Sequence, residues 1–109
     1  MEFLVEFEIR VPDGTPASEV RERERAEAAA AENLVEEGHL LRVWTPDAPG
    51  GAATVLGLYR ADSETELDGL LSALPLYEWM TVTVTGLERH PNDPATAQQT
   101  GRLTARSQS

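Results

Sequence analysis

Residues 2–11 of the chain read EFLVEFEIRV, a stretch in which apolar and charged side chains alternate. A period of two residues over this length predicts a β-strand with one buried face and one exposed face. Pro12, Asp13 and Gly14 follow directly and predict a turn at the end of the strand. The expected buried face comprises Phe3, Val5, Phe7, Ile9 and Val11, and the opposite face comprises Glu2, Glu6, Glu8 and Arg10, with Leu4 as the exception.

Five further elements are predicted after this strand. Residues 16–37 are rich in alanine, glutamate and arginine, which favour a helix, and Gly38 suits its C-terminal end. A second helix is predicted to begin at Asp62 or Ser63, because leucines at positions 67, 70, 71 and 74 recur at helical spacing, and Pro75 should end it. Apolar or alternating segments at residues 40–44, 52–59 and 80–87 predict three more strands.

The order of these elements predicts the fold. Strand, helix, strand, strand, helix, strand is the order of a ferredoxin-like α+β domain, in which a four-stranded antiparallel sheet carries both helices on one face. A chain of 109 residues is long enough for one such domain. We expect it to occupy residues 1–91, followed by a polar tail over residues 92–109 that is flexible or docked on a neighbouring subunit. The bare face of the sheet is expected to be a partner surface.

Composition excludes several functional classes. A formal net charge of −10 argues against binding to nucleic acid and to an anionic membrane surface. The chain has no cysteine, and its two histidines do not stand at metal-ligand spacing, so neither a disulfide nor a metal site is expected. The sequence shows no signal-peptide pattern and no apolar run of membrane-spanning length, which predicts a soluble cytoplasmic protein.

Glu27 is the first candidate for chemistry. It follows Val20 by seven residues and precedes Leu34 by seven, so it should lie on the buried line of the long helix, among small alanines that leave space for a ligand. A carboxylate held there should have a raised pKa, as a base working near neutral pH requires. Glu24 beside it would raise that pKa further, whereas pairing with Arg23 would lower it. The alternative is a solvated helix face with arginine–glutamate pairs.

Five other residues are candidates for a site. Arg42 and Trp44 lie two residues apart on the second predicted strand and should share a face. An inward Arg42 would bind a substrate carboxylate or stabilise an enolate; the alternative is a surface arginine beside a packed tryptophan. Tyr77 and Trp79 belong to an aromatic stretch that forms either the wall of an apolar pocket or plain core. His90 follows the fourth strand, from where it could reach a pocket mouth.

Several segments resemble the muconolactone Δ-isomerase family. The resemblance runs from residue 1 to about residue 93, and its most specific part is LPL at residues 74–76, followed by Trp79 and Met80, a strand, and His90 with Pro91. The other matching segments are residues 1–5, the helix that contains Glu27, residues 37–38, residues 41–44, residues 82–87 and Arg89.

The resemblance implies a ferredoxin-like subunit in a closed homo-oligomer of the dimeric α/β-barrel type, with active sites near subunit boundaries. It implies an isomerase of aromatic hydrocarbon catabolism that needs no cofactor and acts on a small molecule. The reaction moves a double bond in a small lactone by taking a proton next to the carbonyl and returning it elsewhere. Glu27 would be the base and Arg42 the enolate stabiliser or carboxylate clamp. The expected substrate-binding residues are Glu24, Trp44, Tyr77, Trp79 and His90.

The chain departs from the family pattern at three places. Ala28 stands where relatives often carry a basic residue, Thr45 stands where they usually carry arginine, and the third strand is apolar over residues 54–58. Fewer cations favour a less charged ligand than muconolactone. Three functions stay open: a muconolactone isomerase, an isomerase or cyclase acting on a larger apolar intermediate of natural-product biosynthesis, and a non-catalytic binding module. Glu27 facing a pocket would favour the enzymes, and Glu27 in solvent the module.

Overall fold

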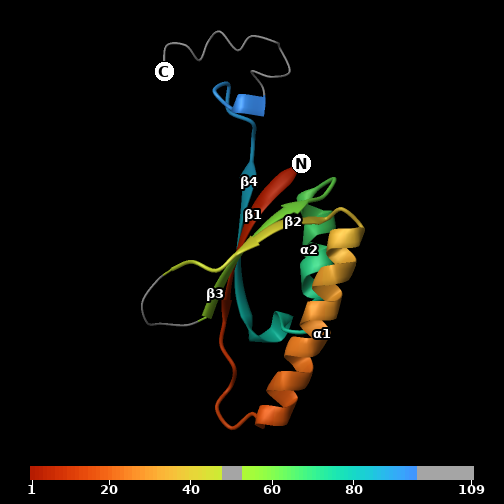
Figure 1. Cartoon of the computed structure of the whole chain (residues 1–109), viewed down its shortest axis with the longest axis vertical. Coiled ribbons are helices and arrows are strands. Elements are labelled where there is room, and N and C mark those ends of the chain that lie inside the picture. The colour runs from red at the N-terminus through yellow and green to blue at the C-terminus, as the bar shows by residue number, and fades with distance from the viewer. Residues whose placement is uncertain (48–52, 96–109) are drawn as a thin grey trace.

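The computed structural model describes residues 1–47 and 53–95 of the chain and confirms the predicted order of elements (Figure 1). Residues 48–52 of the loop after the second strand and residues 96–109 of the predicted tail lie outside the described residues. The strands are β1 (Glu2–Ile9), β2 (Leu40–Trp44), β3 (Ala53–Arg60) and β4 (Met80–Leu87); the helices are α1 (Ala17–Glu36) and α2 (Glu64–Ser72), and a short 3₁₀ helix, η1 (Tyr77–Trp79), precedes β4.

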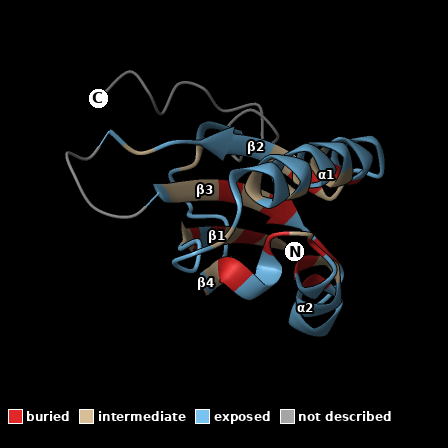
Figure 2. Cartoon of the chain, turned by 90° about the horizontal axis from the view of Figure 1, so that it is seen from below, coloured by how far each residue is buried: buried red, intermediate tan, exposed pale blue. Residues whose placement is uncertain are grey.

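All four strands form one antiparallel sheet in the order β2-β3-β1-β4. β1 is central, and every residue from Glu2 to Ile9 pairs with β3 on one side and with β4 on the other. Both helices lie on the same face of this sheet (Figures 1 and 2), which confirms the ferredoxin-like α+β fold. Because alternate residues of a strand point to opposite faces, the aromatic side chains of β1 all lie on the helical face.

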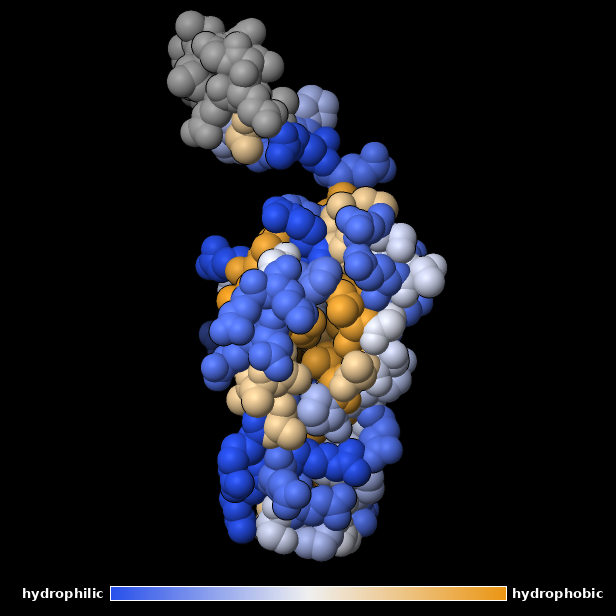
Figure 3. Space-filling view, turned by 90° about the vertical axis from the view of Figure 1, so that its right-hand side faces the viewer, coloured by the Kyte–Doolittle hydropathy of each residue, from blue (hydrophilic) through white to orange (hydrophobic). Residues whose placement is uncertain are grey.

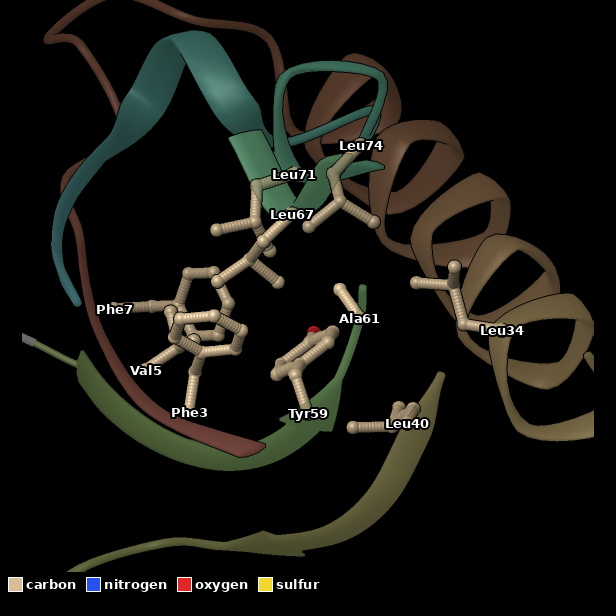
Figure 4. Close-up of a cluster of buried hydrophobic side chains, with 10 residues drawn as sticks. All are labelled: Phe3, Val5, Phe7, Leu34, Leu40, Tyr59, Ala61, Leu67, Leu71 and Leu74. Atoms are coloured by element: carbon tan, nitrogen blue, oxygen red, sulfur yellow. The ribbon is translucent and has the colours of Figure 1, made fainter. Parts of the chain in front are cut away.

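The hydrophobic core lies mainly between β1 and α2. Phe3 and Val5 of β1 pack with Leu67 and Leu71 of α2, and all four side chains are fully buried. Among the described residues of α1, Leu34 alone is buried, so the N-terminal part of this helix is not held down by an apolar stripe. Figure 4 shows the cluster, which comprises Phe3, Val5, Phe7, Leu34, Leu40, Tyr59, Ala61, Leu67, Leu71 and Leu74.

Local chemistry sets the helix ends that the sequence predicted. Gly38 follows α1 with a φ of +83°, in the left-handed region that favours glycine. At the start of α2, the Ser63 hydroxyl accepts a hydrogen bond of 3.1 Å from the N–H of Glu66. Ser63, rather than Asp62, is therefore the N-cap.

Two element ends differ from the prediction. β1 ends two residues before Val11, because β3 and β4 offer no partner beyond its last residue, and the Val11 side chain is exposed. α2 ends at Ser72 and does not continue to Pro75, because a residue that precedes proline is disfavoured in the helical conformation. The N–H of Leu74 instead closes a tighter turn on the carbonyl of Leu71, at 3.0 Å.

The two sides of the molecule differ in character. On the side that carries the helices, hydrophobic atoms gather in a recessed strip between hydrophilic surfaces (Figure 3). The outer face of the sheet, opposite the helices, carries Leu4 of β1 with Leu56 and Leu58 of β3, all partly exposed. Neither helix in the described part of the chain has the length and apolar character needed to cross a membrane.

Candidate functional site

A cavity of about 310 Å³ lies between α1 and the sheet. Its walls come from one helix, all four strands and the segment before β4, so the fold as a whole creates it. Two carboxylates and one phenol are the ionisable groups of a lining that is otherwise apolar. The lining residues are Phe7, Ile9, Glu24, Glu27, Ala28, Ala31, Leu40, Val43, Val55, Gly57, Tyr59, Leu76 and Met80.

Small residues keep this space open. Ala28 and Ala31 present only methyl groups from α1, so the helix can lie over the sheet without filling the gap. Gly57 of β3 leaves space as well, because it has no side chain. A Cβ atom at this position would lie 2.6 Å from Cε1 of Tyr59. A larger residue at position 57 would therefore displace the tyrosine ring, which now lies across the glycine. The predicted space beside the helix alanines is confirmed.

Glu27 lies in the wall of the cavity, as the helical spacing predicted. One of its oxygens, Oε1, accepts a hydrogen bond of 3.0 Å from the backbone N–H of Leu76. Burial raises the pKa of the Glu27 carboxyl above its ordinary value, and this hydrogen bond offsets part of the effect. No ion pair forms with Glu27 among the described residues. The reading of this helix face as a solvated ladder of pairs is therefore wrong at Glu27.

Arg23, which was expected to be able to pair with Glu27, binds elsewhere. Its guanidinium forms ion pairs with Glu78 and, at 3.6 Å, with Glu19. The same group lies over the ring of Trp79, 4.5 Å from the ring centroid. Arg23 therefore forms its ion pairs with Glu78 and Glu19, and none with Glu27 among the described residues.

One peptide group joins these two side chains of α1. Arg23 donates a hydrogen bond of 3.3 Å to the carbonyl of Pro75, and Glu27 accepts from the N–H of Leu76. That carbonyl and that N–H belong to the same peptide bond. The helix therefore binds both polar ends of one peptide group, one turn apart on its own surface. We call this arrangement the peptide clamp.

Of the other predicted residues near this segment, some line the cavity and others do not. Glu24 is exposed and lines the cavity, so it lies at the mouth. Trp79 is buried beneath Arg23 and does not line the cavity, and Tyr77 is exposed and does not line it either. The neighbour that does form cavity wall is Leu76. The aromatic stretch is thus core at Trp79 and pocket wall at Leu76.

Arg42 and Trp44 do share a face, but it is the outer face of the sheet. A bulge lies between Leu40 and Arg42, so Arg42 pairs with Leu58 and not with an inward-facing residue. An extra residue in a strand reverses the facing of every side chain after it. The Arg42 guanidinium lies over the Trp44 ring, 5.3 Å from its centroid, and both side chains are exposed. Of the two alternatives for Arg42, the inward orientation is therefore wrong and the surface arginine is found, although the Trp44 beside it is 41% exposed and not packed.

His90 lies beyond the opposite end of β4 from the cavity. Met80, the first residue of this strand, lines the cavity, and the strand then runs through eight residues to Leu87. At about 3.3 Å per residue, this separates the two ends by roughly 23 Å. His90 instead accepts a hydrogen bond of 2.9 Å at Nδ1 from the N–H of Asn92. It does not reach the cavity of its own chain.

Tyr59 is a residue of the cavity wall that sequence reasoning missed. Its ring is 4% exposed, lines the cavity and packs edge-on against Phe7, with 6.1 Å between ring centroids. Burial, and to a lesser extent the charge of Glu27, raises the pKa of the Tyr59 phenol to about 12. The sequence did offer a signal for this residue: Tyr59 follows Gly57 by two residues, at an inward-facing position of its strand. The described residues contain no cluster of acidic or histidine side chains suited to a metal ion.

Comparison with known proteins matches these features to one family. The family described as "Muconolactone delta-isomerase" matches residues 1–93. Muconolactone Delta-isomerase 1 of Acinetobacter lwoffii is 32% identical over 95 residues, covering 84% of this chain and 93% of that protein. Muconolactone Delta-isomerase of Cupriavidus pinatubonensis is 30% identical over 92 residues, covering 84% and 97%.

Solved structures agree with the sequence comparison. The crystal structure of muconolactone isomerase superposes with a TM-score of 0.73 at 27% identity, covering 85% of this chain and 94% of that one. The 5-chloro-2-hydroxyhydroquinone dehydrochlorinase of Burkholderia phenoliruptrix has a TM-score of 0.63 at 17% identity, covering 85% and 99%. The second likeness concerns the fold alone.

The raised pKa of Glu27 predicts a pH-dependent cost to folding. A carboxyl whose pKa is higher in the folded state than in the unfolded state stabilises the fold at low pH, and this stabilisation is lost as the pH rises through the folded-state pKa. Glu27→Gln keeps the Leu76 hydrogen bond without the charge. We expect it to have a larger free energy of unfolding than the wild type at neutral pH, with the difference vanishing below the ordinary glutamate value of 4.5.

Urea unfolding at a fixed protein concentration measures this difference. Glu32→Gln, an exposed position on the same helix, is the matched control and should change stability by less than about 0.5 kcal/mol. A Glu27→Gln variant that is less stable than the wild type at neutral pH would contradict the assignment of a desolvated charge.

Proposed function

The chain belongs to the muconolactone delta-isomerase family, and from this premise we propose that it shifts a proton within a small unsaturated lactone such as muconolactone, with Glu27 as the base. The observation that carries the proposal is the Glu27 carboxylate in the wall of an apolar cavity, with a pKa raised by burial. This position favours an enzyme over a binding module, in which the carboxylate would face solvent.

One carboxylate accounts for both proton transfers. Glu27 takes a proton from a ring carbon of the unsaturated lactone, and the electron pair of that C–H bond moves into the conjugated system, giving an enolate. The carboxylic acid so formed returns the proton to a different ring carbon, and the double bond changes position. Atoms and electrons balance without an added reagent. The raised pKa of Glu27 makes the proton uptake less unfavourable near neutral pH.

The remaining predicted site residues have different relations to this cavity. Glu24 would contact substrate at the mouth. Arg42, Trp44 and His90 would contact substrate only in the cavity of a neighbouring subunit, since in their own chain they lie on the outer face or beyond the far end of β4. Tyr77 and Trp79 would act indirectly, through the segment that carries Leu76 and the peptide clamp.

We further propose that the protein is a homo-oligomer that associates through the outer face of the sheet. This face is covered by neither helix and carries Leu56 and Leu58 beside Trp44, which is 41% exposed. A domain of this size buries a modest fraction of its surface alone, so association adds stability. Apolar side chains gathered on one bare face are typical of a protein–protein contact.

A second candidate substrate is an uncharged and more apolar ring compound, such as an intermediate of natural-product biosynthesis. Among the described residues, no lysine, arginine or histidine lines the cavity, whereas Glu24 and Glu27 do. Muconolactone carries a carboxylate, which would have to lose water beside these two acids. Like charges in a poorly hydrated site repel strongly, so this lining favours a neutral ligand.

The role of Glu27 can be tested by an isosteric change. We expect Glu27→Gln to lower kcat by about 10²- to 10⁴-fold, because an amide does not accept the substrate proton, while KM changes little. Ultraviolet absorbance follows the shift of the double bond, and circular dichroism checks the fold. Glu32→Gln should keep wild-type activity. Substantial turnover by Glu27→Gln would remove Glu27 from the mechanism.

The two substrate classes can be separated with muconolactone and its methyl ester, which differ in one charge. If the cavity takes neutral ligands, kcat/KM for the ester should exceed that for the acid by about tenfold or more, a difference of about 1.4 kcal/mol. A preference for the free acid would instead favour muconolactone itself and would imply a cation supplied by another subunit.

Self-association can be measured by light scattering at micromolar concentration. The wild type should have the mass of a dimer or a larger assembly, and Leu58→Glu should lower that mass by placing a charge on the outer face. Thr65→Glu, exposed on α2, is the matched control and should leave the mass unchanged. A monomeric wild type would contradict the proposal.

A further inference from the structure

The Tyr59 hydroxyl is a buried polar group without a partner. The side chain is 4% exposed, and its hydroxyl makes no hydrogen bond within residues 1–47 and 53–95. Burying a hydroxyl without a hydrogen bond costs about 1–3 kcal/mol. A phenylalanine would fill the same volume without that cost, so the folded structure alone gives no reason for the oxygen. The missing partner is expected to be a ligand.

Tyr59 and Glu27 face one cavity from two different layers. Glu27 comes from α1, and Tyr59 rises from β3 toward the helical layer (Figure 4). The two groups are close enough for the carboxylate charge to raise the pKa of the phenol, but no hydrogen bond joins them in the described structure. The ring lies across Gly57, where any Cβ would collide with it. A ligand between the helix and the sheet would therefore contact both groups.

We propose that the Tyr59 hydroxyl donates a hydrogen bond to the carbonyl oxygen of the substrate and stabilises the enolate that forms when Glu27 removes the ring proton. This inference rests on the proposed function and adds a second catalytic residue to it. The electron pair released from the C–H bond ends on the carbonyl oxygen, where the phenol binds it. The phenol keeps its own proton throughout, and Glu27 carries the transferred proton in both directions.

The lining of the cavity strengthens the proposed hydrogen bond from Tyr59. No cationic side chain lines the cavity in the described part of the chain, so Tyr59 is the polar donor available to a carbonyl there. Apolar walls such as Phe7 and Val55 offer no hydrogen bond to the enolate. A hydrogen bond in such surroundings is stronger than in water and is already oriented before the reaction begins.

Tyr59→Phe tests the inference with little risk to the fold, because it removes an unpaired oxygen and keeps the ring. We expect kcat to fall by about 10²-fold, as for removal of one donor to an oxyanion, with KM less affected. Thr65→Val, which removes an exposed hydroxyl on α2, should retain wild-type kcat. A Tyr59→Phe variant with kcat within about twofold of the wild type would overturn the inference.

A spectroscopic measurement detects the hydrogen bond itself. The infrared carbonyl stretch of a saturated γ-lactone, which binds but does not react, should shift to lower frequency on binding to the wild type and should not shift with Tyr59→Phe. An equal shift in both proteins would overturn the inference.

The two proposals fail in different ways. A wild type that converts no unsaturated lactone would overturn the proposed function and the inference with it. A wild type that is active and is inactivated by Glu27→Gln, but not by Tyr59→Phe, would overturn the role of Tyr59 alone.

Discussion

The peptide clamp between α1 and the segment before β4 is the contact on which the site depends. Arg23 and Glu27 bind the carbonyl of Pro75 and the N–H of Leu76, the two polar ends of one peptide group. Because Leu34 near the C-terminal end is the residue of α1 that is buried in the core, apolar packing alone would leave the rest of the helix loosely attached. The clamp adds two polar contacts between the helix and this segment, and the cavity lies between the helix and the sheet.

The clamp also sets the chemistry of Glu27. Arg23 has its other partners in Glu78, Glu19 and the Trp79 ring, and no ion pair forms with Glu27 among the described residues. Burial raises the pKa of the Glu27 carboxyl, and the hydrogen bond from Leu76 offsets only part of this effect. The proposed base thus lowers folding stability at neutral pH, and groups with shifted pKa values cluster at functional sites.

The departures from the family pattern have unequal consequences once they are placed in three dimensions. Ala28 lines the cavity, so the absence of a basic residue there acts directly on the ligand. Thr45 is exposed beyond the end of β2 and does not line it. The apolar third strand divides between its two faces: Val55 forms cavity wall, whereas Leu56 and Leu58 lie on the outer face. One apolar run therefore bears both on the ligand and on the surface proposed for self-association.

The sequence by itself determined the element order, the buried face of β1 and the position of Glu27, because each depends on a local period of two or of 3.6 residues. It did not determine the orientation of Arg42. A single bulge after Leu40 turns the following side chains to the opposite face of the sheet, and the hydrophobic pattern gives no sign of it. It also did not reveal the partners of Arg23, the distance of His90 from the cavity, or Tyr59 as an unpaired donor. These features arise where segments far apart in the chain meet, and only the tertiary structure decides which groups find partners there.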